Sequence, residues 1–208
     1  MATTRYSSVH ASHNFHFFEN NTYPYKEPMC GNRGPGGCIY GYLGENLIKS
    51  HKYNRTVFAT GAIGGAKLTS ITDKNLQPYK YFVAEFNNMY RTFNKVDGIL
   101  FHQGESDHNA NHPDGYLEYR NVFSQFVQNL QDDLMDPNFK IYVSRATYCN
   151  NNVDLKLSKV QDELQTLPHV FGGPNTDSLL GRKWRNDGCH FSALGLREVA
   201  SMWMDVLF

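Results

Sequence analysis

Short apolar runs alternate with longer amphipathic stretches along most of the chain. Runs of three to five mostly apolar residues are typical of buried strands. We expect such strands at Asn14–Phe18, Val57–Ala59, Ile99–Phe101, Lys140–Ser144 and His169–Phe171. Because Gly and Pro break regular structure, Gly172-Gly173-Pro174 should end the last of them. The pattern therefore predicts several short strands spread along the chain.

Helical periodicity fills the stretches between these strands. The clearest case is 115–134, where six large apolar side chains recur on one stripe. They are Tyr116, Tyr119, Phe123, Phe126, Leu130 and Leu134. The same period predicts helices at 39–50, 78–93 and 193–207, and another marked by Leu157, Val160, Leu164 and Leu167. Ser192 is a natural N-cap for the last helix.

Strands that alternate with helices in this way predict an α/β fold with a mostly parallel sheet covered on both faces. The length of 208 residues suits one domain, 1–208, with a sizeable core. Residues 1–38 should be mostly irregular, since they are polar and rich in Asn, His, Gly and Pro. The stretch 31–37 must be a loop at its density of Gly and Pro.

Composition and charge argue against several kinds of partner. The formal net charge is zero and basic residues form no long run, so nucleic acid is not indicated. No apolar run approaches the roughly 20 residues that would span a bilayer, so no membrane partner is indicated either. The nine histidines are scattered, and no expected helix carries the His-x-x-x-His pair typical of zinc. The histidine pattern therefore predicts no zinc site.

The unusual polar stretches follow the predicted strands. Gly64-Gly65 comes after the strand at 57–59, Gln103-Gly104-Glu105 after the strand at 99–101, and Thr147-Tyr148-Cys149 after the strand at 140–144. In a parallel α/β sheet, ligands bind beyond the carboxyl ends of the strands. We therefore expect one cleft to collect these stretches together with the loop before the last helix.

That last loop carries Asp187 and His190, three residues apart. A turn of this length can bring a carboxylate against one imidazole nitrogen while the other nitrogen faces a cleft. This is the base and the orienting acid of a serine hydrolase triad. A lone Asp-x-x-His is more often a turn beside a helix cap, and the other polar stretches are what favour the catalytic interpretation.

Taken together, these stretches resemble the SGNH hydrolases, specifically their sialate O-acetylesterase-like branch of carbohydrate esterases. The matching stretches are Tyr23–Pro28, Gly61–Gly65, Phe101–Asp107, Gly173–Asp177 and Asp187–Ser192. The resemblance runs from roughly Tyr23 to the C-terminus. It implies a three-layer α/β/α sandwich with a flavodoxin-like sheet. It also implies hydrolysis of an acetylated carbohydrate or another small acyl ester, with no metal or organic cofactor.

The same resemblance implies catalytic roles for named residues. His190 would be the general base, and Asp187 would hold the imidazole tautomer. The backbone N–H of Gly65, which follows Gly64, and the side-chain amide of Gln103 would form the oxyanion hole. Each oxyanion residue also has a structural alternative: the glycines could form an ordinary tight turn, and Gln103 could satisfy buried backbone groups.

Two further assignments concern support for this site. Glu105 is expected to pair with Arg145 rather than to touch the substrate. Cys149 and Cys189 both fall at the ligand-facing end of the sheet in this interpretation. A disulfide between them and two free thiols are both compatible with the sequence.

The nucleophile is where the chain departs from the family. The family places it in a Gly-Asp-Ser or Gly-Gln-Ser-Asn stretch after the first strand, and no such stretch occurs here. Ser12 is the first candidate, followed by Ser7, Ser8 and the thiol of Cys38. The alternative is a catalytically inactive relative that binds acylated glycans or serves as a partner subunit.

The first strand of the family also has no clear counterpart. Only 22 residues precede Tyr23, too few for a strand, the serine loop and a connection. An unfilled interior position in the sheet would cost roughly 1–3 kcal/mol for each unsatisfied backbone group. Three alternatives stay open: Thr4–Val9 as a substitute strand, a second chain that completes the sheet, or a truncated form with a rearranged sheet.

Overall fold

The structure is a computed structural model that describes residues 14–29, 37–109, 114 and 116–208. The strand considered at Thr4–Val9 and most of the loop expected at 31–37 lie outside these residues. The chain forms two compact units. We call Met1–Gly64 with Leu179–Phe208 the terminal unit, and Gly65–Ser178 the central unit. The expectation of a single domain depends on how these units assemble, and it stays a prediction.

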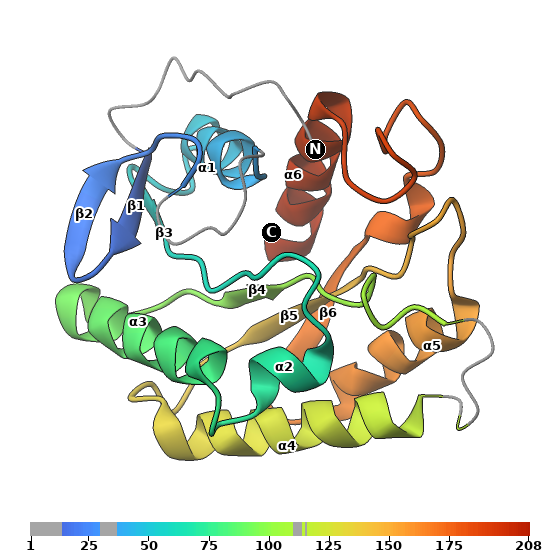
Figure 1. The fold of residues 1–208 in the computed structure, drawn as a ribbon. Coiled ribbons are helices and arrows are strands. Elements are labelled where there is room, and N and C mark those ends of the chain that lie inside the picture. The colour runs from blue at the N-terminus through green and yellow to red at the C-terminus, as the bar shows by residue number, and fades with distance from the viewer. Residues whose placement is uncertain (1–13, 30–36, 110–113, 115) are drawn as a thin grey trace. The chain divides into compact units, whose positions relative to one another are not determined.

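The central unit is built on a parallel sheet, as the pattern predicts. Its strands are β4 (Ile99–Phe101), β5 (Ile141–Arg145) and β6 (Val170–Asn175), in the order β4-β5-β6 (Figure 1). The helices are α2 (Leu68–Thr72), α3 (Gln77–Phe93), α4 (Leu117–Asp133) and α5 (Leu155–Glu163). Two 3-10 turns, Leu164–Thr166 and Thr176–Ser178, complete the unit.

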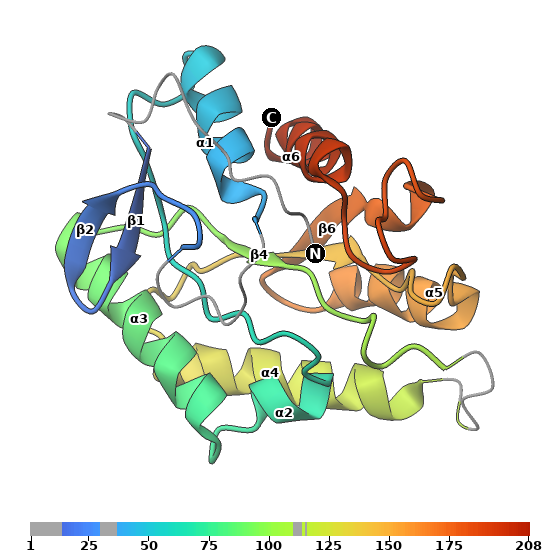
Figure 2. The same ribbon diagram turned by 45° about the horizontal axis from the view of Figure 1, so that its top comes forward.

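One face of this sheet carries the core of the central unit. Alternate strand residues point to the same face of a sheet, and here these residues are buried. They are Phe101, Ile141, Val143 and Val170. The helical stripe predicted at 115–134 packs in the same cluster, with Phe123 in edge-to-face contact with Phe101. Figures 1 and 2 show α2 lying alongside α4 in this unit.

The terminal unit has its own three-stranded sheet, in the order β2-β1-β3. β1 (Asn14–Phe18) forms an antiparallel hairpin with β2 (Asn21–Pro24) and pairs in parallel with β3 (Thr56–Phe58). The backbone of β1 is therefore flanked on both sides, as expected for an interior strand. Helices α1 (Tyr40–Lys49) and α6 (Ala193–Leu207) pack against each other in the same unit.

Most predicted elements are confirmed within a few residues, and three differences have physical causes. β2 escapes the pattern because its residues are polar and mostly exposed. The five residues of α2 are too few to show a helical period. β6 was expected to end before Gly172 but continues to Asn175. A Cβ at Gly173 would lie 2.8 Å from the Ser144 nitrogen, so glycine there lets β6 approach β5 closely.

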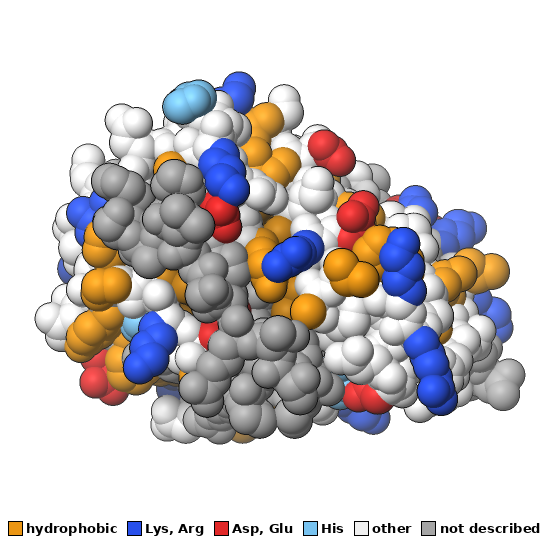
Figure 3. Space-filling model, turned by 90° about the horizontal axis from the view of Figure 1, so that it is seen from above, with side chains coloured by type: hydrophobic (Ala, Val, Ile, Leu, Met, Phe, Trp, Pro, Cys, Tyr) orange, Lys and Arg blue, Asp and Glu red, His pale blue; other side chains and the backbone are white. Residues whose placement is uncertain are grey.

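The face shown in Figure 3 has no basic patch. The described residues also include no helix that could span a membrane. On the face in Figure 3, lysine and arginine side chains stand apart among acidic and hydrophobic ones. Among the described residues, no helix combines the length and the apolar character needed to cross a membrane.

The close approach of β6 to β5 predicts a difference between two adjacent glycines. Gly173→Ala should destabilise the protein by about 1–3 kcal/mol, because its Cβ meets backbone atoms of Val143 and Ser144. Gly172→Ala should cost less, since its Cβ meets only the flexible Gln165 side chain. Urea denaturation of both variants measures this. Equal losses of stability would contradict the packing described.

Candidate active site

The loop before α6 holds Asp187 and His190 in direct contact. His190 Nδ1 lies 2.7 Å from Asp187 Oδ2, and the backbone N–H groups of Cys189 and His190 donate to Asp187 Oδ1 at 3.0 and 2.8 Å. One carboxylate therefore closes the turn and orients the ring. When Nδ1–H donates to Asp187, Nε2 of the neutral imidazole remains an acceptor. The contact predicted from the Asp-x-x-His spacing is confirmed.

These hydrogen bonds also fix the charge of Asp187. Partial desolvation opposes its ionisation, but the His190 ring and the two N–H donors outweigh it and hold the pKa of this carboxyl well below its usual range. A carboxyl whose pKa falls on folding stabilises the fold above its unfolded pKa of about 3.9, and this stabilisation is lost as the pH drops below that value. At neutral pH, Asp187 is a carboxylate that can stabilise a protonated His190.

Arg185 braces the same loop from its buried side. Its side chain is fully buried, and its guanidinium carbon lies 3.7 Å from the centre of the Phe191 ring. Nη1 donates to the Cys189 carbonyl at 2.7 Å and Nε to the Leu179 carbonyl at 3.3 Å. One side chain thus ties the start of the loop to its end. Nothing in the sequence marks Arg185, because loop contacts have no period.

Ser192 ends the loop and starts α6 as predicted. Its hydroxyl oxygen accepts the Gly195 N–H at 3.0 Å, and its O–H donates to the Lys183 carbonyl at 2.7 Å. The first bond is an N-cap, and the second ties the cap back to the loop. The helix that follows therefore begins at a fixed distance from His190.

In the central unit, the turn after β4 lies beside the turn that carries Gly65. Gln103 Nε2 donates to the Ala66 carbonyl at 3.1 Å, and Asp107 Oδ2 accepts the Leu68 N–H at 2.9 Å. Gly65 has a φ of +73°, in the left-handed region that favours glycine. The structure therefore brings together the Gly65 and Gln103 stretches, two of those that were expected to converge.

The side-chain amide of Gln103 is held on every side. Its Nε2 donates to Asp107 Oδ2 at 2.5 Å as well as to Ala66, and its Oε1 accepts the Tyr119 hydroxyl at 3.1 Å. Both amide protons therefore have acceptors, which agrees with the structural alternative for this residue. An oxyanion role requires Gln103 to exchange one of these two bonds for the substrate oxygen.

Asp107 supports the Gln103 side chain, a role that the sequence does not predict. Its Oδ2 joins the Gln103 amide to the first N–H of α2. The signal was available in the Gln-Gly-Glu-Ser-Asp stretch, where Asp107 stands four residues after Gln103. Without the fold, however, no spacing shows that the carboxylate turns back toward Leu68.

The backbone at Gly104 leaves no room for a side chain. A Cβ there would lie 2.4 Å from the Ala146 carbonyl oxygen and 2.5 Å from Gln161 Nε2, and φ is +153°. Gln161 is buried, donates to the Gln103 carbonyl at 2.9 Å and accepts the Ala146 N–H at 2.9 Å. The turn after β4 is thus fastened to the end of β5 through α5.

The expected pairing of Glu105 with Arg145 is wrong. Arg145 instead makes a two-bond contact with Asp162 of α5, with both N–O distances at 2.6 Å. Since α5 packs on β5, Asp162 is the carboxylate that meets the planar guanidinium at the end of that strand. Glu105 lies 4.0 Å from His102 Nδ1.

Asp177, in the Gly173–Asp177 stretch, holds the loop after β5. Its two oxygens accept four hydrogen bonds, from the Thr147 and Tyr148 N–H groups at 2.7 and 2.8 Å and from the Thr147 and Ser158 hydroxyls at 2.6 and 3.0 Å. A buried carboxylate with this many donors is fully satisfied. Its role in this unit is to fix the backbone that leads to Cys149.

The environment of Cys38 opposes a role as nucleophile. Burial raises the pKa of the Cys38 thiol to about 11, and the nearby Glu27 carboxylate adds to this against the effect of the Tyr25 hydrogen bond. The Tyr25 hydroxyl lies 2.9 Å from Sγ. A catalytic thiol needs a lowered pKa. Cys38 is a free thiol, whereas Cys149 and Cys189 are each disulfide-bonded, so the free-thiol alternative for those two is wrong.

The remaining site predictions are not tested by these contacts. Ser12, Ser7 and Ser8 lie outside the described residues. Gly64 lies in the same exposed turn as Gly65, and it is the last residue of the Met1–Gly64 part of the terminal unit. The expected approach of the Asp187–His190 couple to the Gly65 and Gln103 turns joins the two units, and it stays a prediction.

The α/β fold and these stretches agree with the SGNH-type hydrolase fold that the sequence motifs resemble. Residues 28–208 match the family model described as "Carbohydrate esterase, sialic acid-specific acetylesterase". This match covers most of the chain, so the chain belongs to that family and is a carboxylic ester hydrolase of the acetylesterase type. The resemblance first read from the sequence motifs is confirmed. No curated protein matches the chain.

Solved structures share the fold at low sequence identity. A protein from Arabidopsis thaliana has a TM-score of 0.69 and 17% identity, over 93% of this chain and 81% of that one. A protein from Parabacteroides merdae, described as a GDSL-like lipase, has a TM-score of 0.57 and 18% identity, over 84% of this chain and 82% of that one. A carbohydrate acetylesterase from Xanthomonas citri has a TM-score of 0.53 and 15% identity, over 90% of this chain and 46% of that one.

The buried guanidinium of Arg185 predicts a large effect on stability. Arg185→Met leaves the Leu179 and Cys189 carbonyls without this donor, so unfolding free energy should fall by about 2–4 kcal/mol. Chemical denaturation measures the loss. Arg182→Met, an exposed residue of the same loop, is the control and should change stability by no more than about 0.5 kcal/mol. Similar values for the two variants would contradict the brace.

The raised pKa of Cys38 predicts slow alkylation. At pH 8 about a thousandth of the thiol is ionised if its pKa is about 11, so iodoacetamide labelling of Cys38 should be slow and should rise until the pH reaches about 11. Mass spectrometry of the Cys38 peptide follows the reaction, with free N-acetylcysteine as the reference. Rapid labelling at pH 7 would restore Cys38 as a candidate nucleophile.

Proposed function

We propose that this chain is a serine-type carbohydrate esterase that removes O-acetyl groups from sugars by acyl transfer. The observation that carries the proposal is the Asp187–His190 couple, whose 2.7 Å contact lies in a loop braced by Arg185. Membership of a carbohydrate esterase family supports the same reaction. A module that only bound glycans would need neither a fixed tautomer nor an ionised partner for it.

In this mechanism His190 acts twice. Its Nε2 first takes the proton of the serine hydroxyl as Oγ bonds to the ester carbonyl carbon. The tetrahedral intermediate then collapses, the C–O bond to the sugar breaks, and His190 returns the proton to the leaving sugar oxygen. Water attacks the acetyl-serine by the same route and releases acetate. Asp187 stabilises the imidazolium formed in each half-reaction.

The oxyanion is stabilised by the turns of the central unit in this proposal. The Gly65 N–H belongs to an exposed turn, and among the described residues it has no hydrogen-bond partner of its own. Gln103 provides a second donor by exchanging its bond to Asp107 or Ala66. Loss of one such donor typically costs about 2.7–4 kcal/mol of transition-state stabilisation.

For the nucleophile we propose a serine upstream of Tyr23, with Ser12 as the first candidate and Ser7 and Ser8 next. The raised pKa of Cys38 argues against the thiol alternative. Fluorophosphonate labelling followed by peptide mapping identifies the serine directly. A lack of any serine adduct would favour the alternative of an inactive relative that binds acylated glycans or serves as a partner subunit.

The couple predicts a matched pair of kinetic effects. His190→Ala should lower kcat on an O-acetylated methyl glycoside by at least about 10³-fold, and Asp187→Asn by about 10²–10⁴-fold, because both lose the oriented base. Acetate release measures the rates. Because the pKa of Asp187 is depressed, this carboxyl should contribute no limb to the pH profile of wild type between about pH 5 and 9.

His51→Ala is the control for the histidine change, since His51 lies in an exposed turn after α1. It should leave the rate within about twofold of wild type. Wild-type and His190→Ala proteins that hydrolyse the ester equally fast would rule out the proposed mechanism.

A further inference from the structure

The loop that carries His190 is folded into a short antiparallel ribbon. Arg185 and Phe191 form its bridge pair. The Asn186 N–H donates to the His190 carbonyl at 3.0 Å, and the Ser192 N–H donates to the Trp184 carbonyl at 2.7 Å. Side chains alternate between the two faces of such a ribbon.

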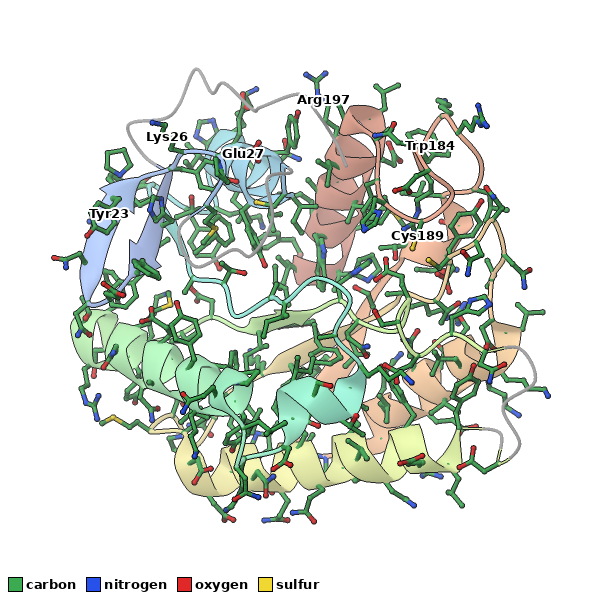
Figure 4. All side chains as sticks on the ribbon, in the orientation of Figure 1. Tyr23, Lys26, Glu27, Trp184, Cys189 and Arg197 are labelled. Atoms are coloured by element: carbon green, nitrogen blue, oxygen red, sulfur yellow. The ribbon has the colours of Figure 1, made fainter. Side chains whose placement is uncertain are left out.

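The alternation separates a buried face from an outer face. Arg185 and Phe191 share one face, which the 3.7 Å contact between them confirms. Trp184, Asn186, His190 and Ser192 then share the opposite face, where Ser192 is buried at the start of α6. Asn186 and His190 are exposed and Trp184 is partly exposed, as expected for an outer face. Figure 4 labels Trp184 and Cys189 in this loop before α6.

Trp184 and His190 are diagonal neighbours across the ribbon. Diagonal side chains in an antiparallel pair have backbones about 7–8 Å apart, within reach of an aromatic ring. An ester carbonyl lies two covalent bonds from the sugar carbon that bears it, or about 3 Å along the chain of atoms. A sugar on Trp184 can therefore present its acetyl group close to His190.

The chemistry of this surface suits a sugar ring. An indole offers a flat apolar face, which matches the C–H face of a pyranose. The Lys183 ammonium lies 4.2 Å from the centre of the Trp184 ring. It can donate hydrogen bonds to hydroxyl or carbonyl oxygens at the ring's edge. Because the ammonium lies over the ring, it covers part of one indole face, and a stacked sugar uses the other face or displaces the lysine.

We propose that Trp184, with Lys183, forms the subsite that binds the sugar ring bearing the ester. This inference rests on the proposed function, since it assigns the position of that function's substrate. It makes Trp184 a residue that selects sugar esters over simple alkyl acetates.

Relative turnover of two substrates tests the subsite. We compare kcat/KM for an O-acetylated methyl glycoside with kcat/KM for ethyl acetate, which has no ring. In Trp184→Ala the ratio of the two should fall about tenfold, with most of the loss in KM for the glycoside. Trp184→Phe should recover most of the ratio, because it keeps an aromatic face. An unchanged ratio in Trp184→Ala overturns the subsite.

Phe208→Ala is a matched control. Phe208 is 53% exposed and has the Lys52 ammonium 5.0 Å from its ring centre, so it repeats the lysine–aromatic pair away from the candidate base. The substrate ratio should stay at its wild-type value in this variant. An equal fall in both variants would show a general surface effect and overturn the proposal.

A binding measurement separates failure of the subsite from failure of the proposed function. The chain has two tryptophans, and Trp203 is fully buried in α6. Titration of the His190→Ala protein with the acetylated glycoside should therefore change the fluorescence of Trp184, and His190→Ala/Trp184→Phe should lose the response. A saturable response without wild-type turnover would refute the esterase mechanism but keep the subsite. No response overturns the subsite.

Discussion

Three hydrogen bonds to one carboxylate organise the candidate catalytic loop. Asp187 accepts two backbone N–H groups and the His190 ring within four residues of chain. The same contacts close the turn, select the imidazole tautomer and keep the carboxyl ionised. A side chain that did only one of these things would leave His190 free to rotate away from a substrate. The orientation of the His190 ring therefore depends first on Asp187.

The central unit reaches the same rigidity by a different route. The turn after β4 is fixed by saturation: each polar atom of the Gln103 side chain has a partner, and Gly104 leaves no space for a Cβ. Such a turn resists movement, but its donors already make hydrogen bonds within the protein before a substrate binds. Catalysis by Gln103 has to offset the loss of one existing bond. The Gly65 N–H has no hydrogen-bond partner among the described residues, so in the proposed mechanism it is the simpler oxyanion donor.

The sequence predicts regular elements well and contacts between loops poorly. β4 and α6 are predicted to the residue, because an apolar run and a long helical stripe are local signals. The Asp187–His190 contact is predicted because three residues of spacing restrict the geometry. Arg185 and the Asp162 partner of Arg145 are not predictable in this way. Their contacts depend on which segments the fold places next to them.

Family membership adds what local signals cannot. The stretches Phe101–Asp107 and Asp187–Ser192 are each weak alone, and the match over residues 28–208 is what shows the carbohydrate esterase family. The departure expected from the sequence motifs concerns the segment around the nucleophile, and its candidate serines lie outside the described residues. The chain's retained features are the ones that orient a base and shape a turn. Those features support chemistry, and the proposed Trp184 subsite gives that chemistry a sugar as its target.

A crystal structure of the fluorophosphonate adduct shows whether base and oxyanion donor meet at one serine, since the phosphonyl oxygen imitates the oxyanion. We expect that oxygen about 2.7–3.1 Å from the Gly65 nitrogen, with His190 Nε2 within about 3.2 Å of the modified serine oxygen. An adduct whose phosphonyl oxygen faces away from Gly65, or with His190 out of reach of the serine, would rule out the proposed mechanism.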